Sequence, residues 1–257
     1  MSAATFRFET GSATHTGRVR EVNEDGLFAD ADWGVWLVAD GMGGHENGQL
    51  ASATIVKEAS TIGNAVSAPD LLARFRDRIF RANASLLQVA DHQGPNVIIG
   101  STVAAVLVYG GHYACVWSGD SRIYLMRDNE FRQVSRDHTE VQELVDSGTV
   151  SAAEARNWPR RNVITRAVGI FDDPDLDMVQ GELRSGDTFV LCSDGLTGPV
   201  EDAEIHSAIA SHPPQAACDA LIDRALDRGA SDNVTVIVVR CRVDESAVAA
   251  PVSGNAA

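Results

Sequence analysis

The sequence predicts an α+β fold of layered, mostly antiparallel sheets, organised as a single domain over residues 1–243. The order of its elements is the first reason: strands, two helices, a β meander, then helices and strands again do not alternate as in a doubly wound parallel sheet. The second reason is size, because 257 residues with 44% hydrophobic content can bury one large core. Neither an internal repeat nor a linker divides the chain.

Four helices are expected outside the middle of the chain. Residues 45–62 and 70–90 carry apolar side chains at a helical period, and in the second of these arginines lie opposite the apolar face. Pro69 suits the first turn of that second helix. Two further helices are expected at 203–210 and 214–228.

Apolar runs bounded by turn residues predict strands. Dipeptides such as Gly110-Gly111 and Asp128-Asn129 separate them, as tight turns require. The expected strands cover residues 101–109, 112–117, 122–126, 131–134, 177–182, 188–192 and 234–243. Residues 244–257 are small and polar, and we expect a disordered tail there.

Short helices are expected between the fourth and fifth of these strands. Asp137 with Glu140, and Ser151 with Glu154, each have the spacing of a capping box. Gly148 would end the first of the two helices.

Composition excludes several classes of function. Acidic residues outnumber basic ones 36 to 21, for a net charge of −15. Such a surface repels phosphate backbones and anionic lipids, so we expect neither nucleic-acid nor membrane binding. No apolar run approaches the roughly 20 residues of a membrane span, and no secretory signal is visible, so a cytoplasmic location is expected.

The cysteines indicate a reducing compartment. They are widely spaced without a C-x-x-C pair, and three lie in apolar runs, which favours buried thiols over a zinc site or disulfides. They are Cys115, Cys192, Cys218 and Cys241.

Acidic residues recur where an apolar strand meets a tight turn. Strand ends of one sheet system lie near each other, so these carboxylates can converge on one pocket. Two carboxylates 4 Å apart repel by about 4 kcal/mol at an effective dielectric near 20, so a cluster of them needs cations, and oxygen ligands favour Mg²⁺ or Mn²⁺. Ordinary Asp-Gly and Asp-Asn turns are the alternative interpretation. The clusters are Asn23-Glu24-Asp25, Asp40-Gly41, Gly119-Asp120, Asp194-Gly195 and Asp232-Asn233.

Six motifs in a fixed order resemble the metal-dependent protein phosphatase family (protein phosphatase 2C type) in its bacterial form. The resemblance extends from about Thr10 to Arg240 and implies a four-layer α/β/β/α sandwich, with two central mostly antiparallel sheets flanked by helix pairs. The motifs are Gly17–Asp25, Val38–His45, Gly100–Thr102, Ser118–Arg122, Ser193–Leu196 and Ser231–Thr235.

The resemblance implies a binuclear centre of Mn²⁺ or Mg²⁺. Asp40 would bridge the two ions, and Asp194 and Asp232 would complete the protein ligands of the first. Glu24 and the backbone carbonyl of Gly41 would hold the second. The short, rigid Asp side chain suits octahedral coordination, and a glycine lets the backbone approach an ion.

Further residues acquire roles from the same resemblance. Asp25 would hydrogen-bond metal-bound waters, and Asp120 with Asp194 would recruit the third ion of bacterial members. Arg20 would grip the substrate phosphate, for which its planar fork is suited. Met42 stands where animal-type members have His, so the general acid is open, with a metal-bound water preferred.

The same resemblance implies a mobile flap beside the metal pocket at about residues 137–173, of which 157–174 show little periodicity. Its cations Arg160, Arg161 and Arg166 would either meet a phosphopeptide or be solvated, with Arg166 packed against its own helix. The acidic run ending at Asp177 lacks the glycine and distal glutamate of a calcium loop, so a solvated turn is expected.

Together these features predict a Mn²⁺- or Mg²⁺-dependent serine/threonine phosphoprotein phosphatase that acts through a metal-activated water. It would oppose a bacterial-type serine/threonine kinase and be a monomer. The alternative is a non-catalytic regulator of the same fold that binds phosphoproteins. The motifs do not identify the physiological substrate.

Overall fold

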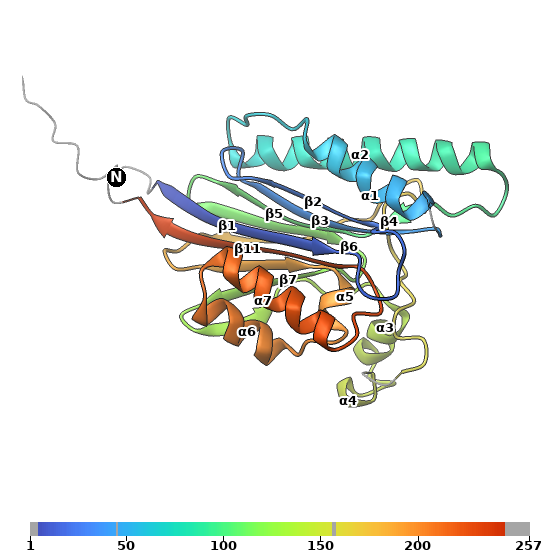
Figure 1. The fold of residues 1–257 in the computed structure, drawn as a ribbon. Coiled ribbons are helices and arrows are strands. Elements are labelled where there is room, and N and C mark those ends of the chain that lie inside the picture. Colours follow the sequence, from blue (N-terminus) through green and yellow to red (C-terminus); the bar gives the residue numbers. More distant parts are fainter. Residues whose placement is uncertain (1–4, 45, 156–157, 245–257) are drawn as a thin grey trace, which may run out of the picture.

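Two antiparallel sheets pack face to face at the centre of the molecule, and a layer of helices covers each outer face (Figure 1). The computed structural model describes residues 5–44, 46–155 and 158–244. The α/β/β/α layering confirms the predicted α+β sandwich. The N-terminal strand and the last strand lie side by side, so the two ends of the fold meet in one sheet.

The first sheet has five strands, all paired antiparallel. Its spatial order is β1 (Phe6–His15), β11 (Val234–Val243), β10 (Thr188–Cys192), β7 (Arg122–Arg127) and β8 (Glu130–Gln133). β1 and β11 pair over ten residues, from Phe6 opposite Val243 to His15 opposite Val234.

The second sheet has six strands, also antiparallel. Its order is β2 (Asp25–Asp30), β3 (Val35–Met42), β5 (Val103–Tyr109), β6 (His112–Ser118) and β9 (Asp177–Glu182), with the short β4 (Gly100–Ser101) paired to the end of β3.

Helix pairs cover the outer faces. The pair on the second sheet is α1 (Glu46–Ala59) and α2 (Ala68–Gln93), and the pair on the first is α6 (Asp202–Ser211) and α7 (Pro214–Asp227). Three shorter helices are α3 (Glu140–Asp146), α4 (Ala152–Ala155) and α5 (Asp194–Thr197). Among the described residues, no helix combines the length and apolarity needed to cross a bilayer.

Strands buried on both faces explain the long apolar runs. In β11, Val236 and Val238 face the helices, whereas Ile237 and Val239 lie between the sheets. Successive strand residues point to opposite faces, so a strand covered on both sides must be apolar throughout. Trp36 in β3 is fully buried in the same central layer. Each large apolar side chain buried in this way stabilises the fold by about 1.5–3 kcal/mol.

Strand bounds at the C-terminal end agree with expectation, but several helix bounds do not. β9, β10 and β11 cover the predicted residues. α1 ends at Ala59, and Ile62 instead packs in the core beyond it. α2 is longer than predicted at both ends, and α5 was not predicted. His45, residues 156–157 and all but the first residue of the predicted tail lie outside the described residues.

Two local predictions were wrong. The run 101–109 is two strands separated at Thr102, whose backbone and hydroxyl both bond Asp40. The N-cap of α3 is Thr139, whose hydroxyl accepts from the Gln142 N–H at 3.2 Å; Asp137 does not cap it. The Ser151–Glu154 capping box is confirmed, with reciprocal bonds of 2.9 and 3.3 Å. All four cysteines are buried and free, as expected.

Candidate active site

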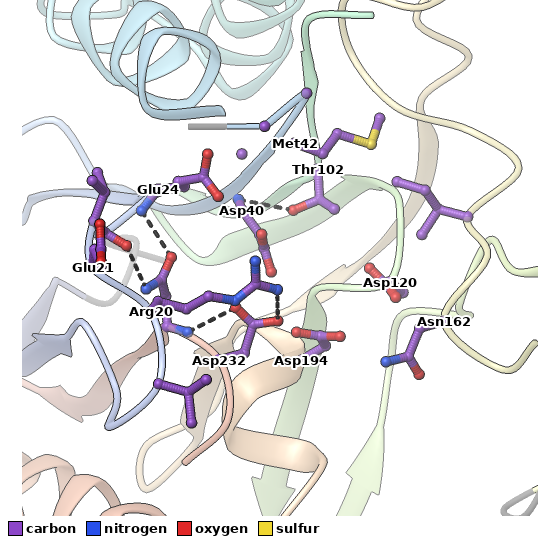
Figure 2. Close-up of a pocket in the computed structure, with 17 residues that line it drawn as sticks. Arg20, Glu21, Glu24, Asp40, Met42, Thr102, Asp120, Asn162, Asp194 and Asp232 are labelled. Atoms are coloured by element: carbon purple, nitrogen blue, oxygen red, sulfur yellow. Dashed lines mark hydrogen bonds and ion pairs between the residues drawn. The ribbon is translucent and has the colours of Figure 1, made fainter. Parts of the chain in front are cut away.

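A cavity of about 670 Å³ brings together residues from both sheets. Of the predicted site residues, it is lined by Arg20, Glu24, Asp40, Gly41, Asp120, Asp194 and Asp232. Figure 2 shows Glu24 on one side, Asp120 on the other, and Asp40, Asp194 and Asp232 between them. Asp25 lies behind this lining, in β2 opposite Asp40.

The second sheet positions Asp40 and Gly41 at the end of β3. The Asp40 N–H donates to the Thr102 hydroxyl at 3.0 Å, and the Thr102 N–H donates to the Asp40 carbonyl at 2.9 Å. The Gly41 N–H donates to the Glu24 carbonyl at 3.1 Å. A Cβ on Gly41 would run into the Gly48 carbonyl oxygen of α1, so only glycine fits here. The main chain of Asp40 and Gly41 is therefore fixed by hydrogen bonds to Thr102 and Glu24, and it packs closely against Gly48 of α1.

The first sheet positions Asp194 and Asp232. Asp194 follows β10 and begins α5, and Asp232 lies two residues before β11, the strand next to β10. Both carboxylates therefore lie at the same end of two neighbouring strands, as expected from their positions in the sequence. The side chain of Asn233 makes the link to Glu24: its carbonyl oxygen accepts from the Glu24 N–H at 2.8 Å.

Asn233 has a structural role that the sequence reasoning missed. Its amide donates to the carbonyls of Thr16 and Val22, at 2.8 and 2.9 Å. With its bond to Glu24, it fastens the loop before β2 to the start of β11. Its sequence signals were an Asp-Asn turn dipeptide and its place in the Ser231–Thr235 motif, neither of which indicated this role.

Asp25 is a buried carboxylate with an uneven environment. Its Oδ2 accepts from the hydroxyls of Ser193 and Thr235, at 2.8 and 2.7 Å. Its Oδ1 is buried and has no hydrogen-bond partner. Burial, helped by the charges of Asp194 and Asp232 and opposed by the two hydroxyls, raises the pKa of Asp25 to about 7. The carboxyl is therefore placed where a nearby positive charge would stabilise it.

Burial and mutual repulsion act on the other carboxylates as well. Burial is the main reason that the pKa values of Asp40, Asp120 and Asp194 are raised, and neighbouring aspartates add to it. Among the described residues, no three Asp, Glu, His or Cys side chains are already drawn together around one point. Concentrated negative charge on oxygen ligands nevertheless fits hard divalent cations such as Mg²⁺ or Mn²⁺.

Arg20 lies at the rim of this cavity. Its Nη2 donates to Asp232 Oδ2 at 2.8 Å, and the side chain is about half exposed. That hydrogen bond is the main reason that the pKa of Arg20 is raised, with Asp40 among the smaller contributions. The guanidinium is thus the cation next to the carboxylates, in a position open to solvent.

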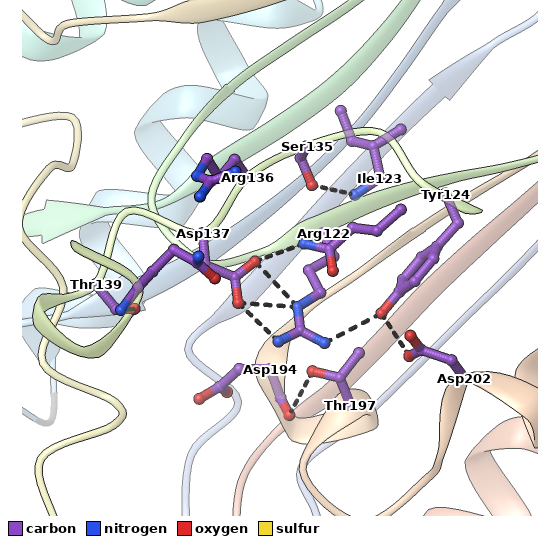
Figure 3. Close-up of polar contacts among 12 residues, drawn as sticks. Arg122, Ile123, Tyr124, Ser135, Arg136, Asp137, Thr139, Asp194, Thr197 and Asp202 are labelled. Atoms are coloured by element: carbon purple, nitrogen blue, oxygen red, sulfur yellow. Dashed lines mark hydrogen bonds and ion pairs between the residues drawn. The ribbon is translucent and has the colours of Figure 1, made fainter. Parts of the chain in front are cut away.

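Arg122 is a second cation near the site, which the sequence reasoning quoted in a motif but assigned no role. Its guanidinium donates to Asp137 at 2.7 and 3.0 Å and to the Tyr124 hydroxyl at 3.2 Å (Figure 3). The Tyr124 hydroxyl donates in turn to Asp202 at 3.0 Å. The positive charge of Arg122 opposes the upward pKa shift of Asp194. Asp137, the first residue of the predicted flap, is thereby attached to β7.

The predicted flap contributes Asn162 and Ile164 to the cavity lining, and Figure 2 shows Asn162 on the side of Asp120. Neither residue was expected there. Arg166 pairs with Asp175 at 3.1 Å and Asp177 at 3.4 Å, so it does not pack against a helix of its own, and the acidic turn is partly neutralised.

Comparison with known proteins agrees with this architecture. A model of the family Protein phosphatase 2C matches residues 14–228. The chain belongs to the protein phosphatase 2C family. Within this family, the serine/threonine protein phosphatase PstP of Mycobacterium tuberculosis is 38% identical over 240 residues, covering 93% of this chain and 46% of PstP. The serine/threonine phosphatase Stp of Listeria welshimeri is 33% identical, covering 88% of this chain and 93% of Stp.

A solved member of the protein phosphatase 2C family shows the same fold. The crystal structure of the PstP catalytic domain in complex with two manganese ions has a TM-score of 0.84 and 33% identity, covering 93% of this chain and all of that one. The present chain spans about half the length of the full PstP protein.

Proposed function

We propose that this protein is a Mn²⁺- or Mg²⁺-dependent serine/threonine phosphoprotein phosphatase. The observation that carries the proposal is one cavity lined by six carboxylates, with a half-exposed arginine at its rim. Membership of the protein phosphatase 2C family, and the manganese ions of the related PstP domain, support it. The substrates would be phosphorylated proteins, which a serine/threonine kinase must supply.

The proposed metal ligands are the residues that the sequence singled out. Asp40 would bridge two ions, Asp194 and Asp232 would serve the first, and Glu24 with the Gly41 carbonyl would serve the second. Their support is their common cavity and the backbone bonds that hold Asp40 and Gly41 in place.

Asp120, opposite Glu24 in the cavity, would act with Asp194 on a third ion (Figure 2). Asp25 would hydrogen-bond ligand waters through its unpartnered Oδ1. Both roles are proposals supported by these positions.

The protein's own groups would orient the substrate. Bound divalent ions would supply a water of lowered pKa and positive charge for the phosphoryl oxygens. Arg20 would donate from its guanidinium to those oxygens, exchanging its bond to Asp232 for bonds to phosphate. Met42 lines the cavity but has no proton to donate, so the leaving alkoxide must take its proton from another group.

Phosphate release from phosphothreonine and phosphoserine peptides tests this function. We expect release with manganese, none with a chelator, and a loss of at least about 100-fold in Asp194→Asn. Asp91→Asn, an exposed position on α2, is the matched control and should keep full activity. Turnover that survives complete metal removal would overturn the proposal. Tight phosphopeptide binding without turnover at saturating manganese would favour the non-catalytic regulator.

A phosphotyrosine peptide completes the substrate panel and should be the poorest substrate. A cytoplasmic location and a monomeric state stay predictions from the sequence.

A further inference from the structure

The loop before β2 presents Arg20 from a firmly held backbone. The Arg18 N–H donates to the Ala230 carbonyl at 2.9 Å, and the Arg18 guanidinium donates to the Leu226 carbonyl at 2.7 Å. Asn233 holds the two ends of the same loop, at Thr16 and Val22. The side chains that this loop directs outward are therefore held in place before any substrate arrives.

Two of those side chains are apolar and exposed. Val19 is 68% exposed and Val22 is 37% exposed, and they flank Arg20 in the sequence. Both line the same cavity as the carboxylates. An exposed valine on a mobile segment would be unremarkable, but here two of them are held at the rim beside the arginine proposed to bind phosphate.

We propose that Val19 and Val22 form a subsite that selects phosphoproteins with an apolar side chain next to the phosphorylated residue. The inference rests on the proposed function and specifies its substrate class. Covering exposed apolar surface is favourable at about 25 cal/mol per Å², and a valine held in advance loses little entropy on binding.

The reach of the loop defines which substrate positions are involved. Val19 and Val22 are three residues apart, so they span at most about 10 Å. An extended substrate advances about 3.3 Å per residue, so with the phosphate at Arg20 the valines reach the one or two residues on either side of it.

The charge on the same rim argues against acidic neighbours in the substrate. Glu21 is exposed and lines the cavity between the two valines in the sequence. In Figure 2 it lies on the Glu24 side of the pocket. A carboxylate there repels an aspartate or glutamate beside the phosphorylated residue, so the rim combines apolar attraction with a repulsive element.

The test compares three phosphothreonine peptides whose residues next to phosphothreonine are leucine, serine or aspartate. The enzymes are the wild type, the double variant Val19→Ser/Val22→Ser, and Val66→Ser. Val66 is 78% exposed and lies outside the cavity, so it is the matched control. Each kcat/KM is divided by the rate of the same enzyme on p-nitrophenyl phosphate, so that damage to the metal centre cancels.

In the wild type we expect leucine-flanked peptide to exceed serine-flanked peptide about tenfold, with the aspartate-flanked peptide poorest. The double variant should reduce the leucine preference to within about twofold, through KM and not kcat. Val66→Ser should keep the full preference.

An undiminished leucine preference in the double variant, or an equal loss in Val66→Ser, would overturn the subsite. Release from all three peptides without a leucine preference would also overturn it, while leaving the phosphatase function intact. Absence of manganese-dependent release from every substrate would instead overturn the proposed function.

Discussion

Replacing Asp25 by asparagine should stabilise the protein at pH 8 in the presence of a chelator. The substitution keeps the shape of the side chain and an oxygen that can accept from the Ser193 and Thr235 hydroxyls. It replaces the buried Oδ1, which has no hydrogen-bond partner, by an amide that has no negative charge. The variant thus removes a buried charge with little change in packing.

The magnitude follows from the pKa of Asp25. Burial and the nearby aspartates raise it from 3.8 to about 7, so between about pH 4 and pH 7 the folded chain binds this proton more tightly than the unfolded chain does. The free energy of unfolding therefore falls as pH rises through that window. The full effect at pH 8 is about 4 kcal/mol. We expect Asp25→Asn to recover about 2–4 kcal/mol at pH 8 and almost nothing at pH 4.

The free energy of unfolding is measured at pH 4, 5 and 8 by urea denaturation in the presence of chelator, with tryptophan fluorescence as the signal. Asp91→Asn on α2 is the control, and its stability should follow that of the wild type at each pH. Manganese should stabilise the wild type more than Asp25→Asn, because a cation relieves a charge that the variant lacks. A variant no more stable than wild type at pH 8, or equally stabilised at pH 4 and pH 8, would refute the reasoning.

Three further substitutions test other parts of the structure. Arg122→Met leaves the partly buried Asp137 carboxylate without its guanidinium and should cost about 3 kcal/mol in urea denaturation; a loss below about 1 kcal/mol would contradict the role of the pair. The hydrogen bond from Arg228 lowers the pKa of Glu204 to about 2, so its stabilisation is present above pH 4.5 and is lost as pH falls towards 2. In Glu204→Gln the free energy of unfolding should therefore fall less steeply as pH drops from 4.5 to 2. A pH dependence equal to that of the wild type would contradict the role of the pair. Gly41→Ala forces a Cβ against a carbonyl oxygen of α1 and should cost about 2 kcal/mol and weaken manganese binding in calorimetry; unaltered binding would exclude a tight fit there.

Elements with a strong local signal were predictable from the sequence. β10 and β11 each contain an apolar run of four residues, Phe189–Cys192 and Val236–Val239, and their predicted bounds match the structure. The Ser151–Glu154 capping box was equally predictable, because both partners lie within four residues and the interaction is local.

Features that depend on distant partners were not predictable. Asp137 has the spacing of a helix cap, but Arg122, fifteen residues earlier, binds it instead. The strand expected over 101–109 breaks at Thr102 because that residue bonds Asp40, which is 62 positions away. A bidentate guanidinium–carboxylate pair is stronger than a single cap bond, so tertiary contact overrides the local preference.

The sequence by itself singled out the candidate groups for the chemistry and the order in which they occur. Asp40, Asp194 and Asp232 are recognisable from their motifs alone, as is Arg20. Only the tertiary structure decided that they share a cavity, that Asp25 lies buried behind them, and that the pKa values of Asp25, Asp40 and Asp194 rise. The physical reason is that desolvation and Coulomb repulsion depend on distance and burial in space, and neither is encoded by separation along the chain.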